Sequence, residues 1–314
     1  AQRAFLTRFV NELVAAGHAF RNPSATWCCA PLIVPKQGAD QFRFTVDLRP
    51  VNKVTIPSSW PMPHLDSELN RIAGSSVFAT FDLSQGYWQL SLDAASQDCQ
   101  SFITPDGVFT PTRVLHGTTN AVPHLQACVQ GILGDLSDAI LAWLDDLLMH
   151  AIDEHALLKL LRRFFQMCRD YNLKLHPGKC VLFSKMVRWC GRLISFNGVR
   201  FDPRRVQALH DMALPVTGAD LQQFVCALNW MRTSIPSFAT LISHLQDLLE
   251  AVYSHAGKRT KSAASKILLS KVGWSPSHAE SFRVCQQAIE HAVTLAHPHS
   301  GKRLCVYTDA SSVF

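Results

Sequence analysis

Residues 140–149 have the sequence Ile-Leu-Ala-Trp-Leu-Asp-Asp-Leu-Leu-Met, in which two adjacent carboxylates interrupt an otherwise apolar run. Without them, a run of this length is typical of one buried strand. The acidic pair instead predicts a tight hairpin of two apolar strands, with Asp145 and Asp146 at its tip. Two like charges that lose water destabilise each other, and a bound cation would remove most of that cost. The stretch therefore predicts a metal site, and an ordinary Asp-containing turn is the alternative.

The composition is that of a folded chain. Of its 314 residues, 47% are hydrophobic and 17% are charged, and the charged share lies below the ~25% of an average domain. The length suffices for two or three modules, no apolar run reaches the ~20 residues of a membrane span, and no signal peptide precedes the first expected helix. Ten cysteines without a Cys-x-x-Cys pair indicate reduced, intracellular thiols and exclude a disulfide framework. We expect a piece of a longer polypeptide.

The positive charge is concentrated in one part of the chain. The net charge is +6, and residues 159–205 contain twelve Lys or Arg but only two acids, Asp170 and Asp202. A local excess of this size suits a polyanion such as nucleic acid. The alternative is a solvated helix face followed by basic loops.

A further carboxylate follows an apolar segment earlier in the chain. Residues 77–81 predict a strand that ends at Asp82. Carboxylates from two such elements can hold two divalent ions about 3.5–4 Å apart, which serve phosphoryl transfer. The sequence therefore joins Asp82 to Asp145 and Asp146 as one candidate metal site.

Basic side chains accompany a strand pattern near the N-terminus. Residues 42–48 alternate between apolar and polar, which predicts a half-buried strand with Arg43 and Arg49 on one face. Lys36 lies on the preceding strand of the same predicted hairpin. Together Lys36 and Arg43 could bind a phosphate-bearing ligand, and an ordinary polar strand face is the alternative.

Taken in order, these and other segments resemble the reverse transcriptase of gypsy-type long-terminal-repeat retrotransposons, which is related to the retroviral enzymes. The resemblance extends over nearly the whole chain. The matching segments are residues 43–53, Trp60-Pro61-Met62-Pro63, residues 81–89, residues 117–121 with Gln126, Trp143-Leu144-Asp145-Asp146, residues 175–183, Trp189-Cys190-Gly191, Asn229-Trp230 with residues 235–238, and residues 307–311.

The resemblance implies an α+β fold of the right-hand polymerase class. It implies an N-terminal helix and lead-in over 1–27, fingers and palm over 28–200, and thumb or connection helices over 201–254. A basic linker is expected over 255–271, and the truncated start of an RNase H-like domain over 272–314.

The implied activity is RNA-directed DNA synthesis with two Mg²⁺ ions, with Mn²⁺ as a possible substitute. The metal-binding catalytic residues would be Asp82, Asp145 and Asp146. The nucleotide-binding residues would be Lys36, Arg43, Leu83, Tyr87, His116 and Gly117. Lys179 is a candidate general acid or a plain phosphate contact, Trp189 and Gly191 belong to the primer-grip region, and Asp309 would be the first RNase H ligand.

The implied partners are an RNA or DNA template with its primer and deoxynucleoside triphosphates, without a membrane. The family resemblance places the protein inside the cell, in cytoplasmic particles or the nucleus. Some residues differ from the usual pattern: Trp143 replaces Tyr, Leu115-His116 replaces Pro-Phe, and Val122-Pro123 replaces Pro-Ala. A catalytically inactive relic that only binds nucleic acid is therefore an alternative. A metal nuclease or phosphatase is another, although it leaves Lys36, Arg43 and Tyr87 unexplained.

Overall fold

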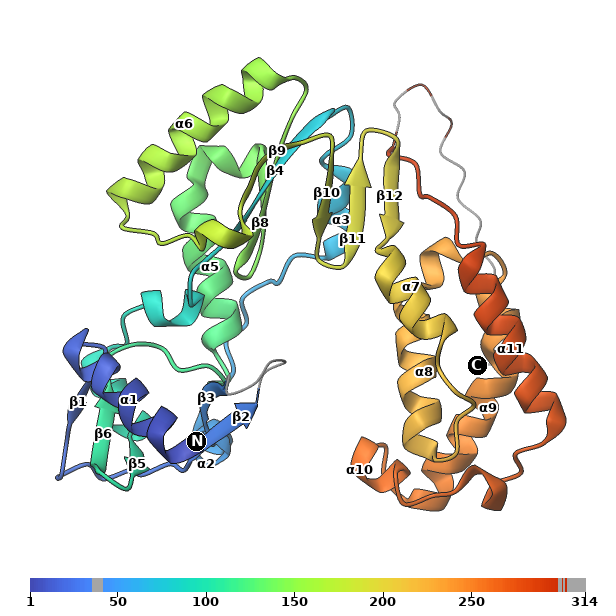
Figure 1. Ribbon diagram of the computed structural model, residues 1–314, viewed down its shortest axis with the longest axis horizontal. Helices are drawn as coiled ribbons and strands as arrows, with labels where there is room; N and C mark the ends of the chain where they lie inside the picture. The colour runs from blue at the N-terminus through green and yellow to red at the C-terminus, as the bar shows by residue number, and fades with distance from the viewer. Residues whose placement is uncertain (36–41, 299–300, 302, 304–314) are drawn as a thin grey trace. The chain divides into compact units, whose positions relative to one another are not determined.

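The computed structural model describes residues 1–35, 42–298, 301 and 303. The chain forms two compact units, Ala1–Ser184 and Lys185–Phe314, whose elements are labelled in Figure 1. The strands between 186 and 201 belong to the second of these units. The family resemblance instead groups them with the fingers and palm, which it ends at residue 200. Within the described residues, no helix combines the length and the apolar character that crossing a membrane requires.

The first unit is built on a four-stranded antiparallel sheet with the strand order β7-β8-β4-β9. Its strands are β4 (Val77–Asp82), β7 (Ile140–Trp143), β8 (Asp146–Ala151) and β9 (Val181–Ser184). Strands β7 and β8 are the two arms of the predicted hairpin, with Ile140 opposite Met149 and Trp143 opposite Asp146. The predicted hairpin at residues 140–149 is therefore confirmed.

The two faces of this sheet have different neighbours. Side chains alternate along a strand, and one set, which includes Val77, Ala79 and Phe81, packs on α5 (Ala121–Leu133) and α6 (Glu154–Asp170). The rings of Phe81 and Phe164 lie 4.5 Å apart, centroid to centroid. Asp82 and Asp146 belong to the other set by the same alternation, so they face away from the two helices.

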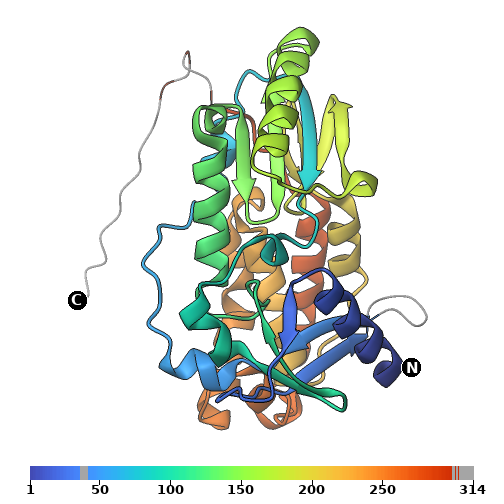
Figure 2. The same cartoon turned by 90° about the vertical axis from the view of Figure 1, so that its left-hand side faces the viewer.

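The remainder of the first unit surrounds two smaller sheets. One is the hairpin of β2 (Pro31–Pro35) and β3 (Phe42–Val46), and the other has the order β1-β6-β5. Helix α1, drawn in dark blue in Figure 2, contributes Leu6 and Val10 to the core beside Phe44. The other elements are α1 (Gln2–Ala15), β1 (Ala19–Arg21), α2 (Arg49–Val54), α3 (Leu65–Asn70), α4 (Ala94–Gln97), β5 (Phe102–Thr104) and β6 (Gly107–Pro111).

The strand at residues 42–48 is shorter than the sequence predicts. Strand β3 stops at Val46, and Arg49 begins α2. The guanidinium of Arg49 donates from Nε to the Asp47 carboxylate at 2.7 Å. The prediction that Arg43 and Arg49 share one strand face is therefore wrong, because Arg43 lies in β3 whereas Arg49 lies in α2, which has Pro50 in its first turn.

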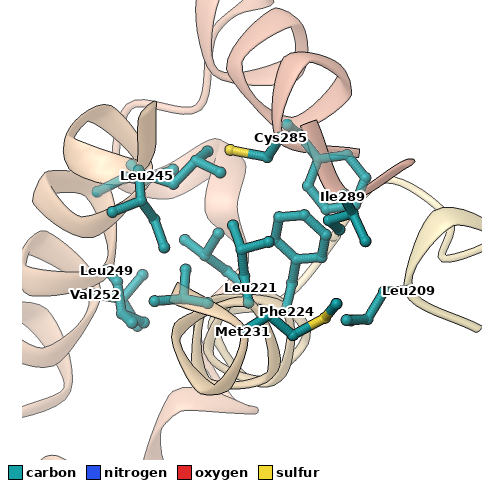
Figure 3. Packing of buried hydrophobic residues seen from close by; sticks show 14 of the residues in the cluster. Leu209, Leu221, Phe224, Met231, Leu245, Leu249, Val252, Cys285 and Ile289 are labelled. Carbon is teal, nitrogen blue, oxygen red and sulfur yellow. The ribbon is translucent and has the colours of Figure 1, made fainter. Parts of the chain in front are cut away.

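The second unit joins a three-stranded sheet to a helical core. The sheet consists of β10 (Met186–Trp189), β11 (Arg192–Ser195) and β12 (Gly198–Phe201). Figure 3 shows the core, in which the rings of Phe224 and Phe282 lie 4.1 Å apart, centroid to centroid. The helices are α7 (Pro203–His210), α8 (Gly218–Trp230), α9 (Phe238–Ala256), α10 (Lys261–Ala264) and α11 (Pro276–Glu290). Helix α8 begins at a capping box formed by Thr217 and Asp220.

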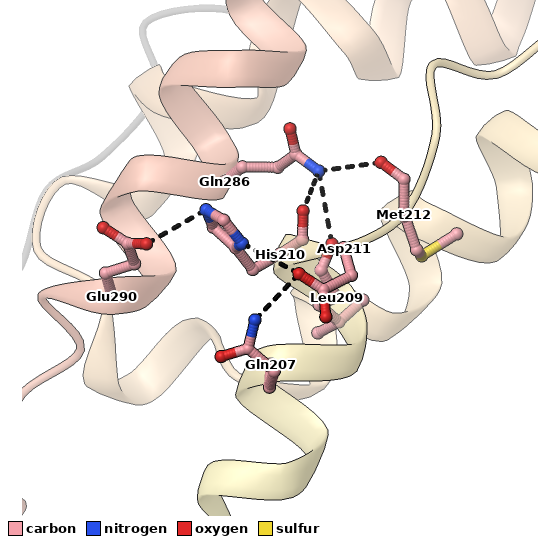
Figure 4. Close-up of polar contacts among 7 residues, drawn as sticks. All are labelled: Gln207, Leu209, His210, Asp211, Met212, Gln286 and Glu290. Carbon is pink, nitrogen blue, oxygen red and sulfur yellow. Dashed lines mark hydrogen bonds and ion pairs between the residues drawn. The ribbon is translucent and has the colours of Figure 1, made fainter.

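Two segments that were expected outside the thumb helices are part of this core. Residues 255–271 are folded and not a linker, since α10 lies within them and Ala264 and Leu269 are buried. Helix α11 packs on α9 and α7, and the Gln286 side chain donates to the carbonyl oxygens of His210 at 2.6 Å and Met212 at 2.9 Å (Figure 4). Residues 276–290 therefore complete the helical core. Residues 304–307 and Asp309 lie outside the described residues.

Candidate active site

The register of the large sheet brings two of the predicted carboxylates together. Asp82, the last residue of β4, lies directly opposite Asp146, the first residue of β8. Residues paired in this way have Cβ atoms about 4.5–5.5 Å apart and side chains on the same face. Asp145, which precedes Asp146, lies at the hairpin tip. Its carbonyl oxygen accepts a hydrogen bond of 2.8 Å from the backbone N–H of Leu83. The end of β4 and the hairpin tip are thus tied together.

A buried glutamine fixes the shape of the tip. Leu144 has φ +58°, a conformation that residues other than glycine adopt only when their surroundings impose it. The Gln126 side chain accepts from the Leu144 N–H and donates to the Ala142 carbonyl, both at 2.9 Å, and it is fully buried. Gln126 is thus a positioning residue that the predicted site lacks. The signal available was its place, with residues 117–121, among the segments that match the family.

The segment after α6 supplies a cation to the site. The His176 N–H donates to the Asp82 carbonyl oxygen, and Ser84 donates to Lys174, which lays residues 174–179 along the end of β4. The Lys179 ammonium group then donates to both carboxylate oxygens of Asp82, at 3.1 and 2.9 Å. Lys179 was predicted as a general acid or a plain phosphate contact, and here it forms an ion pair with Asp82.

The carboxylates affect one another electrostatically. Burial, and after it the negative charges of Asp145 and Asp82, raise the pKa of Asp146 to about 6, while the Lys179 ammonium opposes part of that shift. A carboxylate whose ionised form is destabilised in this way is one that a cation would stabilise. The site is therefore short of positive charge even with Lys179 in place.

The donor set fits a hard divalent cation in type. Carboxylate oxygens are the ligands that Mg²⁺ and Mn²⁺ prefer, usually one or two per ion together with water and substrate phosphates. Within the part of the chain that the structure describes, no three His, Cys, Asp or Glu side chains are gathered as a ready-made metal site. Lys179 neutralises Asp82 in this arrangement. A metal at these carboxylates therefore remains a proposal.

Two aromatic side chains lie beside the carboxylates. Tyr87 follows the turn at Gly86, and a Cβ on Gly86 would lie 3.5 Å from the Cβ of Asp145. Burial and the charge of Asp145 both raise the pKa of Tyr87. The His116 ring meets the Tyr87 ring edge to face at a centroid distance of 5.3 Å. Tyr87 therefore lies in contact with His116 and within the electrostatic influence of Asp145.

A second amide holds the loop that carries His116 and Gly117. The Asn52 side chain donates to the Gly117 carbonyl and accepts from the Thr119 N–H, both at 2.9 Å. Gly117 has φ +101°, which a side chain would strain. Asn52 therefore fixes this loop against α2, and it too is missing from the predicted site residues.

Other predicted residues are not joined to this group. Arg43 is exposed on β3 and, among the described residues, makes no hydrogen bond or ion pair with the three carboxylates. Lys36 lies outside the described residues, as does Asp309. Trp189 and Gly191 belong to the second unit. The roles assigned to these residues stay predictions.

The basic stretch 159–205 divides into two parts. Its first basic residues, Lys159, Arg162, Arg163 and Arg169, are exposed on α6, which covers the sheet face opposite to Asp82 and Asp146. Arg163 forms an ion pair with Asp135. A strand of nucleic acid at the carboxylates would therefore not reach these four side chains. The alternative of a solvated helix face fits α6, and only the residues after it remain candidates for contact with nucleic acid.

With this geometry established, comparison with known proteins decides the family. A family model described as reverse transcriptase (RNA-dependent DNA polymerase) matches residues 34–194, just over half of the chain. The chain belongs to the reverse transcriptase family. The carboxylate site, its Gln126 support and the Tyr87–His116 pair all lie within the matched residues.

Curated relatives of this reverse transcriptase chain are retrotransposon polyproteins. The retrovirus-related Pol polyprotein from transposon 297 of Drosophila melanogaster is 28% identical over 92% of the chain, and the Tf2-3 polyprotein of Schizosaccharomyces pombe is 26% identical over 97%. The chain spans only 26% and 22% of these relatives' lengths. These matches confirm the predicted resemblance to gypsy-type elements.

Solved structures confirm the right-hand polymerase fold of the reverse transcriptase chain. A foamy viral protease-reverse transcriptase in complex with double-stranded DNA has a TM-score of 0.82 at 21% identity, over 93% of this chain and 48% of that one. The same viral protein with an RNA/DNA hybrid has a TM-score of 0.80 at 21% identity, over 94% and 38%. At this identity the likeness establishes the fold alone.

Proposed function

We propose that this chain catalyses RNA-directed DNA synthesis as the polymerase portion of a retrotransposon polyprotein. The observation that carries the proposal is the register that sets Asp82 opposite Asp146, with Asp145 held at the adjoining tip. Membership of the reverse transcriptase family supports it. A nuclease or phosphatase would need the same carboxylates but would have no use for the Tyr87–His116 pair beside them.

Asp82, Asp145 and Asp146 would hold two divalent ions, Mg²⁺ or Mn²⁺. When bound, such ions neutralise the charge that develops on the attacking and leaving oxygens of phosphoryl transfer. The protein's own contribution is position: β4 and β8 fix two carboxylates by backbone pairing, and Gln126 fixes the third through the tip. Lys179 would exchange its contact with Asp82 for one with a substrate phosphate, where it could also donate a proton.

The nucleotide would lie over Tyr87 and His116, with Gly117 and the backbone of Leu83 at its edge. Arg43 would reach its phosphates from β3, and Lys36 would be a second basic contact for them. The primer and an RNA or DNA template would be bound by the hairpin of Trp189 and Gly191 and by basic residues between Lys174 and Arg200. We further propose that residues 304–311, with Asp309, begin an RNase H-like domain, and that the protein works inside the cell.

The alternative of an inactive relic rests on residues that differ from the family pattern, and their positions do not support it. Leu115 is buried in the core beside Phe44. Pro123 is the third residue of α5, where a helix needs no N–H donor. Trp143 ends β7 in regular pairing with Asp146. These substitutions leave the carboxylates and Gln126 in place.

A primer-extension assay tests the proposal. The purified chain is given an RNA template with a labelled DNA primer, four deoxynucleoside triphosphates and Mg²⁺, and extension is expected. Binding of the primer–template without any extension in Mg²⁺ or Mn²⁺ would establish the relic. Degradation of the primer–template in place of extension would support a nuclease.

The raised pKa of Asp146 predicts that Asp146→Asn stabilises the chain when no divalent ion is present. At pH 8 the wild-type carboxylate is ionised in the folded and unfolded states, and the folded state pays for its burial beside two like charges. The variant should therefore gain on the order of 1–3 kcal/mol in free energy of unfolding. As the pH falls from about 6 to about 4, Asp146 of the folded wild type takes up a proton before that of the unfolded chain does. The difference in free energy of unfolding between the variant and the wild type should therefore shrink.

Urea unfolding in EDTA at pH 8 and pH 4.5 measures this difference. Asp170→Asn, which changes an exposed carboxylate at the end of α6, is the matched control and should show no such dependence on pH. A stability difference of equal size at both pH values would show that folding does not raise the pKa of Asp146.

A further inference from the structure

The hairpin between β10 and β11 ends in a strained two-residue turn. Trp189 pairs with Arg192, so only Cys190 and Gly191 form the turn. Their φ angles are +46° and +75°, as in the mirror-image turns that suit the twist of a hairpin. Cys190 is not a glycine, and the conformation costs it energy that neighbouring contacts must supply.

Those contacts come from the first turn of α7. The Asp202 N–H donates to the Gly191 carbonyl at 3.1 Å, and the Asp202 carboxylate forms an ion pair with Arg188 of β10 at 3.3 Å. The Arg205 guanidinium lies flat against the turn, since a Cβ on Gly191 would come within 2.5 Å of its Cζ atom. A side chain at residue 191 would therefore displace the guanidinium from this place.

Arg205 is itself seated on an aromatic ring. Its Cζ atom lies 4.9 Å from the centroid of Trp230, the last residue of α8. Arg192, which follows the turn, lies 5.4 Å from the same ring and 4.8 Å from that of Phe201. Two guanidinium groups from the hairpin side and from α7 thus meet on Trp230. Such contacts of cation and ring contribute more where water is excluded, and Arg192 is buried.

We propose that Arg205, held on Trp230, is a positioning residue for the primer end. By packing on both Trp230 and Gly191, it holds the turn Cys190–Gly191 in a fixed position relative to helices α7 and α8. This inference rests on the proposed function, in which that turn contacts the primer strand. Because the guanidinium packs on both the turn and the indole ring, it sets the backbone of the turn without needing to touch nucleic acid.

The test compares Arg205→Met and Arg205→Lys with the wild type. The rate of the first nucleotide addition is measured in single turnover on a saturating primer–template, together with the apparent affinity for the nucleotide. Arg205→Met should slow addition about fivefold to tenfold and leave the nucleotide affinity unchanged. Arg205→Lys should remain slow, because a lysine keeps the charge but not the planar stack.

A direct phosphate contact would give the opposite pattern. Arg205→Lys would then restore the rate, and Arg205→Met would reduce the salt dependence of primer–template binding by about one phosphate contact. Either result overturns the inference. The matched control is Arg259→Met, which removes a similar stack, 5.3 Å above the Tyr253 ring, away from the hairpin, and should leave the rate unchanged.

Gly191→Ala tests the contact between residues 191 and 205 by stability alone, without a measurement of activity. In the wild type the new methyl group collides with Arg205 and also meets the strain of a positive φ. In the Arg205→Met background the flexible side chain can move aside, so the same substitution should cost clearly less stability in thermal unfolding. Equal costs in both backgrounds would overturn the contact. An inactive wild type would overturn the proposed function, whereas an active wild type with unaltered Arg205 variants would overturn this inference alone.

Discussion

Asp145→Asn is expected to abolish primer extension while primer–template binding stays close to that of the wild type. The substitution keeps the size of the side chain and the backbone bond from Leu83 to residue 145. It removes one of the three negative charges that would hold divalent ions. Loss of a metal ligand in a phosphoryl-transfer site should slow nucleotide addition about a thousandfold or more.

The affinity of Asp145→Asn for the primer–template should not fall with its rate of nucleotide addition. The groups proposed to hold the primer–template are the basic residues after α6. Single-turnover extension and an equilibrium titration of labelled primer–template, both at two salt concentrations, separate the two quantities. Asp170→Asn is again the control, since that carboxylate lies at the end of α6 and bonds only to Gln166 among the described residues. Extension by Asp145→Asn at the wild-type rate would refute the assignment. Binding that does not weaken with salt would count against the basic residues as the contact.

Tyr87→Ala is expected to raise the use of ribonucleotides relative to deoxyribonucleotides by about tenfold to hundredfold. The ring meets the His116 ring at a centroid distance of 5.3 Å, and the charge of Asp145 helps to raise the pKa of its hydroxyl. A nucleotide whose phosphates lie at the carboxylates would therefore have its sugar over this ring. A 2′-hydroxyl would then collide with it, and specificity by collision is lost when the ring is removed.

Tyr87→Phe provides the matched control, because it keeps the ring and removes only the hydroxyl. Its selectivity should equal that of the wild type if exclusion is steric. The measurement is the ratio of kcat/KM for a ribonucleotide and the corresponding deoxyribonucleotide in primer extension. An active Tyr87→Ala variant with unchanged selectivity would show that the ring serves only to pack the core.

The parts of the site that follow from local sequence could be predicted. The Asp145–Asp146 hairpin and the strand that ends at Asp82 depend on apolar runs and an acidic interruption, and these are visible without knowledge of tertiary contacts. That Asp82 lies opposite Asp146, and not one residue out of register, depends on sheet pairing across 64 positions. The family resemblance implied that pairing, and periodicity alone does not fix it.

Other features depend on contacts that no local pattern encodes. Gln126 and Asn52 lie in segments that match the family, but their role, in which one side-chain amide satisfies two backbone groups, depends on tertiary contacts. The basic residues of α6 were grouped with the basic loops after it as one candidate surface for nucleic acid. A count of charges does not show which side of a sheet a helix covers. Residues 255–271 are basic, and residues 272–290 precede the segment that resembles an RNase H domain, so both were separated from the helical core that they complete.

The strand order β7-β8-β4-β9 has a consequence for the order in which the protein can be made. Both neighbours of β4 are encoded after it, β8 beginning 64 residues and β9 almost 100 residues downstream of its last residue. A nascent chain therefore carries segment 77–82 with both edges open until β8 has been made, and with one edge open until translation reaches Ser184. Exposed edges of this kind pair readily with other chains, and non-local pairing forms slowly. Ribosome-bound chains that stop before residue 146 should thus depend on chaperones far more than chains released after residue 184.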